Sequence, residues 1–158
     1  MIGLKFGGTS VGSSSAIRRV GSIIQERLER QPFVVVSAVG GVTDRLFELR
    51  DLCLEEQAWE DSFANLCGIH RTILEELELD VQLVDGLLEE LKGLLGELAA
   101  AGECTRRALD QLVSFGERMS SLSLIHISEP TRLLSIADAV VCVKKKRGGG
   151  GGGGGGGG

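Results

Sequence analysis

The sequence predicts an α/β fold in which helices flank a parallel sheet. Two short apolar runs, residues 2–6 and 33–36, are each followed by a turn rich in glycine and hydroxyl residues and then by apolar residues at helical spacing. A strand, a helix and a second strand in this order call for a crossover connection and hence a parallel pair. Ligands bind at the carboxyl edge of such sheets, so both turns are expected at one candidate site.

The first strand, expected at residues 2–6, is apolar on both faces and is therefore predicted to be central in its sheet. Three serines at 13–15 offer N-caps for a helix whose apolar residues keep helical spacing to about residue 30. Pro32 breaks this helix. Residues 33–36 then read as a second strand, short and fully buried.

The second turn covers residues 37–44 and leads into a helix that is expected to begin near Thr43 and to run into Leu52. Thr43 or Asp44 could serve merely as the N-cap of that helix. Residues 60–112 are helical and acidic, and a leucine stripe between 84 and 98 favours an intramolecular helix pair over a free coiled coil. Thr105 can cap a last helix that runs through Val113.

The octet KFGGTSVG, from Lys5 to Gly12, carries the strongest chemical signal. Paired glycines let backbone N–H groups approach a phosphate without a Cβ in the way. The start of a helix adds its dipole and its unpaired N–H donors, and Lys5 can place an ammonium beside the same anion. The octet is not a Walker A loop, because its lysine precedes the glycines.

This octet resembles the N-terminal motif of aspartate kinases, within the amino-acid kinase family. Two later segments are similar to elements of that family in the same order: SAVGGVTD at 37–44 matches V-S-A-x-x-G-x-T-[DN], and SFGERMSS at 114–121 matches [SV]-x-G-E-x-[ML]-S. The resemblance covers residues 1–121. It implies the N-terminal half of a catalytic domain, whose amino-acid-kinase-type parallel sheet is expected to be incomplete in this chain.

The resemblance also implies the reaction and the roles of individual residues. The reaction is transfer of the γ-phosphoryl group of ATP to the β-carboxylate of L-aspartate, with Mg²⁺ as cofactor, in lysine, threonine and methionine biosynthesis. By the match, L-aspartate is bound by Thr43 and Glu117, and Lys5 is the catalytic charge on the transferred group. The ATP phosphates are expected to contact Lys5, Phe6, Gly7, Gly8, Thr9, Ser10 and Ser37. A full-length parent is expected to be a homo-oligomer, and the chain as written is expected to be inactive and poorly soluble.

Residues 122–158 are predicted to be an artefactual tail, disordered or non-native. LSLIHISEPTR, from Leu122, resembles a translated sequencing adapter of the transposon type, and IADAVVCVKKK at 136–146 differs from the continuation of that adapter by four T-to-G changes. A run of A and then of G accounts for three lysines, an arginine and the eleven glycines at 148–158. The competing interpretation is a genuine basic, glycine-rich tail that binds nucleic acid.

The charge and cysteine content narrow the function further. The tail holds five of the 17 basic and two of the 22 acidic residues, so residues 1–121 carry a net charge of −8, which disfavours nucleic acid as a partner. No signal peptide or membrane-length apolar run is present, and a cytoplasmic location is expected.

Cys53, Cys67 and Cys104 are expected to be reduced and buried. Cys67 and His70 lack a second ligand pair, so no metal site is predicted and His70 is expected at the surface or hydrogen-bonded.

Two other functions remain open at this point. The chain could derive from a different amino-acid kinase, one that acts on glutamate or on a nucleotide. It could also be a non-catalytic acidic helical module, for which the leucine stripe is the only support.

Overall fold

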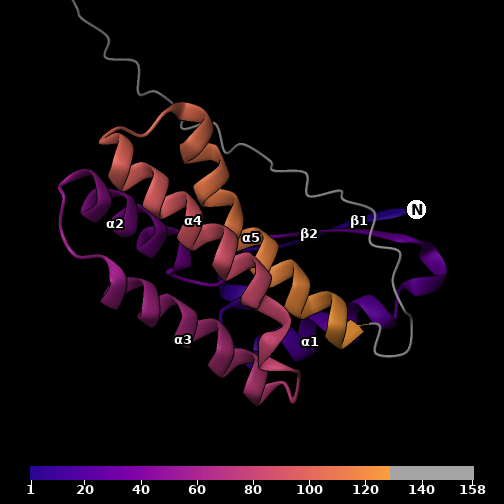
Figure 1. Cartoon of the computed structure of the whole chain (residues 1–158). Coiled ribbons are helices and arrows are strands. Elements are labelled where there is room, and N and C mark those ends of the chain that lie inside the picture. The colour runs from indigo at the N-terminus through magenta and orange to yellow at the C-terminus, as the bar shows by residue number, and fades with distance from the viewer. Residues whose placement is uncertain (129–158) are drawn as a thin grey trace, which may run out of the picture.

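The computed structural model, which describes residues 1–128, pairs two strands in parallel, β1 (Ile2–Phe6) and β2 (Pro32–Val36). Lys5 lies opposite Val35 in the register. Just beyond the paired strands, the N–H of Ser37 donates to the carbonyl oxygen of Phe6 at 3.0 Å. The parallel pair predicted from the strand–helix–strand order is confirmed, and both strands end at the same edge (Figure 1).

The connection between the strands is more segmented than the sequence indicates. It consists of a 3-10 helix η1 (Gly8–Val11), the helix α1 (Ser14–Gln25) and a 3-10 turn η2 (Leu28–Arg30). Ser13 caps α1, because its hydroxyl accepts the N–H of Ala16 at 3.3 Å. The expected helix to residue 30 was too long: α1 ends at Gln25, and Gln31 takes a left-handed conformation with φ 49°. The α conformation is disfavoured directly before Pro32.

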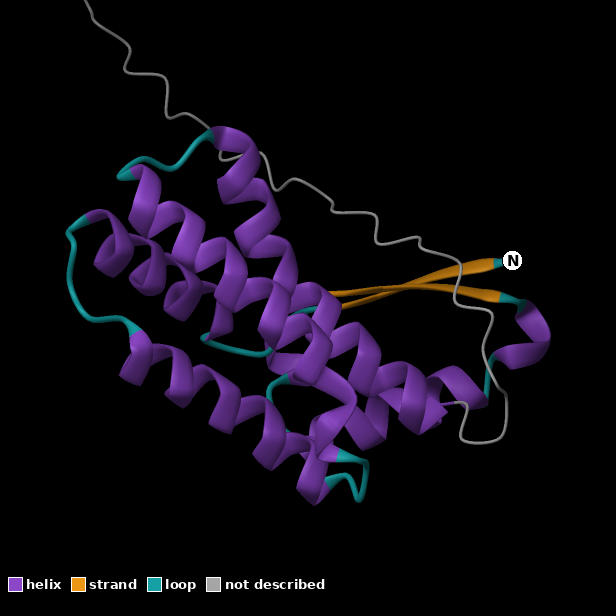
Figure 2. Ribbon diagram, viewed as in Figure 1, coloured by secondary structure: helices purple, strands orange, loops and turns teal. Residues whose placement is uncertain are grey.

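The remaining elements are α2 (Val42–Leu54), α3 (Glu60–Glu76), a 3-10 helix η3 (Val81–Val84), α4 (Asp85–Ala101) and α5 (Arg106–Ser128). Figure 2 shows that helices dominate the described chain and that the strand pair projects from them toward the N-terminus. The leucine stripe faces inward, since α4 packs against α2 and α5. Its buried members are Val84, Leu88, Leu91, Leu95 and Leu98. The predicted intramolecular helix packing is confirmed.

Within the described residues, helices cover one face of the strand pair. Leu4, Phe6, Val34 and Val36 pack against the helical core, whereas Gly3, Lys5 and Phe33 on the alternate positions are exposed. Phe33 is 51% exposed. The expectation of a fully buried second strand was therefore wrong for this part of the chain, because strand alternation sends every second side chain to the face that no described element covers.

The helix α5 extends well beyond the expected end near Val113. Its start agrees with the sequence, since the Thr105 hydroxyl accepts the N–H of Ala108 at 3.2 Å. The segment 114–121 lies wholly inside the helix. The helix also continues past residue 121, where the predicted tail was expected to begin. Leu124, 4% exposed, continues the buried stripe of α5, and the helix packs against α1. Whatever the origin of LSLIHIS at 122–128, its apolar residues fall at helical spacing. The rest of the predicted tail, 129–158, lies outside the described residues.

His70 and the cysteines differ in how far the helices bury them. His70 is 1% exposed and its Nε2 atom has no hydrogen-bond partner within residues 1–128, so the expectation of a surface or hydrogen-bonded histidine was wrong. Cys53 and Cys67 are buried free thiols as expected, whereas Cys104 is only half-buried. No helix among the described residues has the length and apolarity that crossing a membrane requires.

Candidate functional site

The first turn of the candidate site follows β1 directly. Gly7 precedes η1, and the N–H of Ser10 donates to the carbonyl oxygen of Gly7 at 2.9 Å. The first N–H groups of η1 have no partner inside that helix, as at any helix start. Thr9 is exposed and Ser10 is half-buried. The glycine turn therefore leads into η1, and α1 begins six residues later behind its own serine cap.

The second turn touches the first through backbone atoms. A Cβ placed on Gly8 would lie 3.1 Å from the carbonyl oxygen of Ala38, and one on Gly40 would lie 3.7 Å from the carbonyl oxygen of Gly8. Gly41 has a φ of +80°, in the left-handed region that favours glycine, and α2 starts at the next residue. Gly8 thus lets the two turns lie against each other at the end of the strands, while Gly41 supplies the left-handed conformation that precedes α2.

The helix α5 closes the same site from the side. A Cβ on Gly116 would lie only 2.6 Å from the Cβ of Ala38 and 3.3 Å from a methyl group of Val42. This spacing brings the backbone of α5 directly onto the second turn. Glu117, the next residue, is therefore held at the junction of the second turn and α5.

The carboxyl group of Glu117 is partly withdrawn from solvent. Its side chain is half-buried, and the Oε2 atom is buried without a hydrogen-bond partner within the described chain. Burial raises the pKa of Glu117 above its usual value, while the backbone N–H groups of Glu117 and Ala38 act in the opposite direction. A buried carboxylate oxygen without a donor is costly unless a ligand supplies one.

The two hydroxyl residues of the second turn are placed differently. Thr43 is not the cap of α2, because Gly41 occupies the N-cap position and Thr43 lies in the first helical turn. Ser37 is half-buried at the end of β2. Its N–H donates to the carbonyl oxygen of Phe6, and its carbonyl oxygen accepts the hydroxyl of Ser120. The structure shows no hydrogen bond from either side-chain hydroxyl to another of the described residues. The interpretation of Thr43 as a mere cap was wrong.

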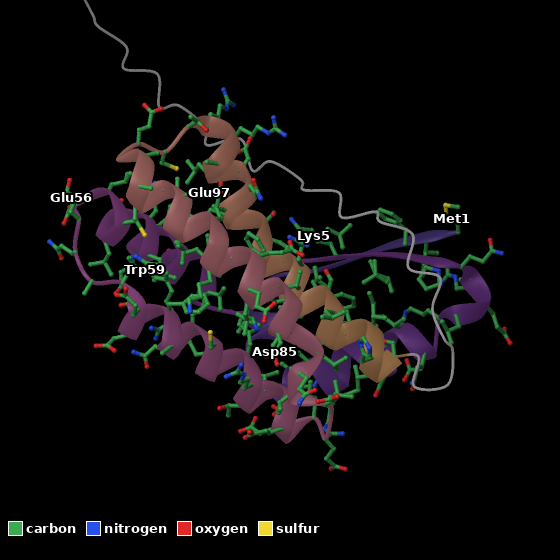
Figure 3. The ribbon with its side chains drawn as sticks, in the orientation of Figure 1. Met1, Lys5, Glu56, Trp59, Asp85 and Glu97 are labelled. Atoms are coloured by element: carbon green, nitrogen blue, oxygen red, sulfur yellow. The ribbon has the colours of Figure 1, made fainter. Side chains whose placement is uncertain are left out.

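Lys5 lies near the inner end of β1, opposite the end that carries Met1 (Figure 3). Its side chain is exposed on the strand face that faces away from the helices. No acidic group in the described part of the chain pairs with its ammonium. Lys5 is accordingly available to an anion at the first turn, while Phe6 beside it packs into the core.

A separate hollow of about 480 Å³ lies between the start of α1 and α3. Gly12, Ser13 and Glu76 are among its lining residues, but Lys5, Ser37, Thr43 and Glu117 are not. Elsewhere in residues 1–128, no three His, Cys, Asp or Glu side chains gather as metal ligands would. The candidate site is thus the surface where the two turns and α5 meet.

Sequence reasoning overlooked one member of this site, Ser120. Its hydroxyl donates to the carbonyl oxygen of Ser37 at 2.7 Å, and the residue is 1% exposed. The motif SFGERMSS contains Ser120, but the sequence offers no sign of its partner. Helical spacing after Gly116 is the one signal that could have placed it on the same face.

Comparison with known proteins identifies the family of this chain. The family model described as "Amino acid kinase family" matches residues 2–138. The aspartokinase of Chlamydia muridarum is 40% identical over 118 residues, covering 74% of this chain and 25% of its own length. Aspartokinase 1, chloroplastic, of Arabidopsis thaliana is 35% identical over 122 residues, covering 75% of this chain and 21% of its own length.

A solved structure shares the arrangement. Escherichia coli aspartokinase III in complex with aspartate and ADP superimposes with a TM-score of 0.63 at 28% identity, covering 80% of this chain and 28% of that one. The chain thus spans about a fifth to a quarter of the length of the curated relatives it matches. With a family model that matches most of its length and an α/β arrangement like that of aspartokinases, the chain belongs to the amino acid kinase family.

Proposed function

We propose that this chain provides the phosphate-binding and amino-acid-binding part of an aspartate kinase, which converts ATP and L-aspartate to ADP and 4-phospho-L-aspartate. The observation that carries the proposal is the meeting of two glycine turns with the carboxylate of Glu117, whose Oε2 atom is buried without a donor among the described residues. The similarity to aspartokinases supports the choice of acceptor.

The reaction requires positioned charges rather than a general base. The β-carboxylate of aspartate is already ionised at neutral pH, so it can attack the γ-phosphorus without losing a proton. The enzyme must bring two anions together and stabilise the charge that develops during transfer. In this proposal Lys5 supplies the positive charge, Gly7, Gly8 and Thr9 supply donors, and Ser10 and Ser37 lie beside the phosphates.

The acceptor is held on the other side of the second turn. The α-ammonium of L-aspartate would donate to Glu117 Oε2, which lacks a donor in the described chain. The hydroxyl of Thr43, in the first turn of α2, would contact the same substrate. Ala38, whose backbone lies beside the Glu117 carboxyl, and Gly40, three residues before Thr43, both touch the first turn, so the proposal places acceptor and phosphates at adjoining turns.

Mg²⁺ belongs to this proposal only through the nucleotide. The described residues contain no cluster of three carboxylate, thiolate or imidazole ligands, so they offer no cage made of protein groups alone, and Mg²⁺ usually keeps water and phosphate oxygens among its ligands. The ion would be carried on the ATP phosphates. A cytoplasmic location and a role in lysine, threonine and methionine synthesis stay predictions, and the names of the Arabidopsis relatives state that those are chloroplastic.

Isothermal titration of the 158-residue chain with L-aspartate and with Mg·ADP tests the proposal. Glu117→Gln should weaken aspartate binding about tenfold or more and leave Mg·ADP nearly unchanged, because a charge-assisted hydrogen bond contributes about 1.5–3 kcal/mol. Lys5→Ala should weaken Mg·ADP binding and spare aspartate. Glu97→Gln and Lys92→Ala, on the exposed side of α4, are the matched controls.

The pattern of losses decides the outcome. Equal weakening of both ligands by Glu117→Gln would contradict the assignment of this carboxylate to the amino acid. Binding of L-glutamate more tightly than L-aspartate would favour another member of the family.

A further inference from the structure

The buried hydroxyl of Ser120 joins two parts of the candidate site that are far apart in sequence. Its Oγ donates to the carbonyl oxygen of Ser37 at 2.7 Å, across 83 residues. The carbonyl oxygens of Gly116 and Glu117 lie at 3.1 and 3.2 Å from the same atom. A hydroxyl has one hydrogen to donate, so the shortest of these contacts identifies Ser37 as its main acceptor.

The carbonyl of Ser37 depends on this bond. Ser37 lies just past β2, and its carbonyl oxygen accepts no backbone N–H within residues 1–128. Its own N–H is bonded to Phe6 at the end of β1. Removal of the Ser120 hydroxyl would therefore leave a half-buried acceptor without a partner at the point where the second turn begins.

Ser120 acts on the same face of α5 as the other contacts of the second turn. It follows Gly116 by four residues and Glu117 by three, which places all three on neighbouring positions of one helical surface. Gly116 lets the helix backbone approach Ala38, and Ser120 bonds the residue before Ala38. The second turn is thus fastened to α5 on both sides of Glu117.

We propose that Ser120 is a positioning residue, which fixes the turn 37–41 against α5 and thereby holds the Glu117 carboxylate beside Ala38. Its influence on aspartate binding rests on the proposed function of Glu117. Its influence on the turn does not, because that depends only on the bond to Ser37.

The chain contains a matched control for this inference. Ser123 lies on α5 one turn further along, is 2% exposed, and donates to the carbonyl oxygen of Met119 at 3.2 Å. The Ser123 bond stays within its own helix, as does the weaker contact of Ser120 with Gly116. Ser120→Ala and Ser123→Ala therefore remove the same buried group, but only the first breaks a link to another element.

Amide hydrogen exchange of the 158-residue chain, measured by NMR, tests the inference without any ligand. In Ser120→Ala the N–H groups of Ser37 and Val42 should exchange about tenfold faster relative to those of α4, since one net hydrogen bond is lost. Ser123→Ala should leave that ratio unchanged. Ser120→Cys, with a weaker donor of similar size, should fall between them. Equal ratios in Ser120→Ala and Ser123→Ala would overturn the inference.

Titration with L-aspartate then separates this proposal from the proposed function. Ser120→Ala should raise the dissociation constant for aspartate about tenfold, whereas Ser123→Ala should leave it unchanged. A general loss of stability could not produce this difference between the two variants. If the unmodified chain binds no aspartate, the proposed function fails while the exchange ratio still decides the role of Ser120. If the ratio changes but aspartate binds Ser120→Ala as tightly as the unmodified chain, positioning of Glu117 is refuted.

Discussion

Gly116 lies so close to Ala38 that a Cβ on the glycine would stand 2.6 Å from the Cβ of the alanine. Real side chains do not approach this closely, so α5 can reach the second turn only because residue 116 has no side chain. The contact sets where Glu117 lies. Gly116, which the packing of α5 requires, is therefore adjacent in sequence to Glu117, the proposed binding residue, and each position constrains the other.

Gly116→Ala should destabilise the fold, by about 1–3 kcal/mol, because the added methyl group must displace either α5 or the second turn. Gly93→Ala is the control: this glycine is exposed inside α4 with nothing within 4 Å of an added Cβ. It should stabilise the fold by up to about 1 kcal/mol through helix propensity. Urea unfolding followed by circular dichroism measures both, and destabilisation of the two variants by similar amounts would contradict the close approach.

The pH dependence of stability should report on His70. Burial lowers the pKa of His70 from 6.5 to about 4, so the folded state holds the ring neutral while the unfolded chain binds a proton below about 6.5. Stability from this group is complete above pH 6.5 and declines as the pH falls toward 4, by about 3 kcal/mol in all. His70→Leu should remove this decline, whereas substitution of the half-buried His126 by Gln should retain it. Unfolding curves at pH 7, 5.5 and 4 compare the three chains.

The cysteines should differ in reactivity according to burial. Burial raises the pKa of the Cys53 and Cys67 thiols, which lowers the fraction of reactive thiolate, and both side chains are shielded from reagents. Cys104 is half-buried and lies two residues before α5 begins. Brief treatment with iodoacetamide at pH 8, followed by peptide mass spectrometry, should label Cys104 well before Cys53 and Cys67. Equal labelling of Cys53 in native and urea-unfolded chain would show that α2 is not packed as described.

Features set by neighbouring residues could be predicted from the sequence. The caps Ser13 and Thr105, the glycine turns and the parallel strand pair all depend on contacts within a few residues or on the chirality of one crossover. Contacts that join distant segments could not. Nothing in the sequence near Ser120 indicates an acceptor 83 residues earlier, and nothing near Gly116 indicates Ala38.

The errors have the same origin. Phe33 was expected to be buried because an apolar run resembles a strand covered on both faces, although which face is covered depends on other elements. His70 was expected to be exposed or bonded because a single polar residue in a helix usually is, yet it lies in the core. The end of α5 was placed near Val113 because residues 114–121 were interpreted as a motif and those from Leu122 as a tail, although the apolar spacing of both segments continues the helix.

Replacement of Glu117 should expose a conflict between binding and stability. Burial raises the pKa of Glu117, so the fold disfavours its charged form. The sign of the effect follows from proton linkage. Below the unfolded pKa of 4.5 the carboxyl group is protonated in both the folded and the unfolded state, and stability is lost as the pH rises from there through the raised pKa of the folded state.

Glu117→Gln removes a charge that must be buried and should therefore raise the Tm at pH 7 while it weakens aspartate binding. The gain in Tm should vanish near pH 4, where the native glutamate is neutral as well. The exposed Glu97→Gln should change the Tm little at either pH. Calorimetry at pH 4 and pH 7 checks the sign, and a lower Tm of Glu117→Gln at pH 7 would show that the carboxylate is stabilised by contacts within the protein rather than kept for a ligand.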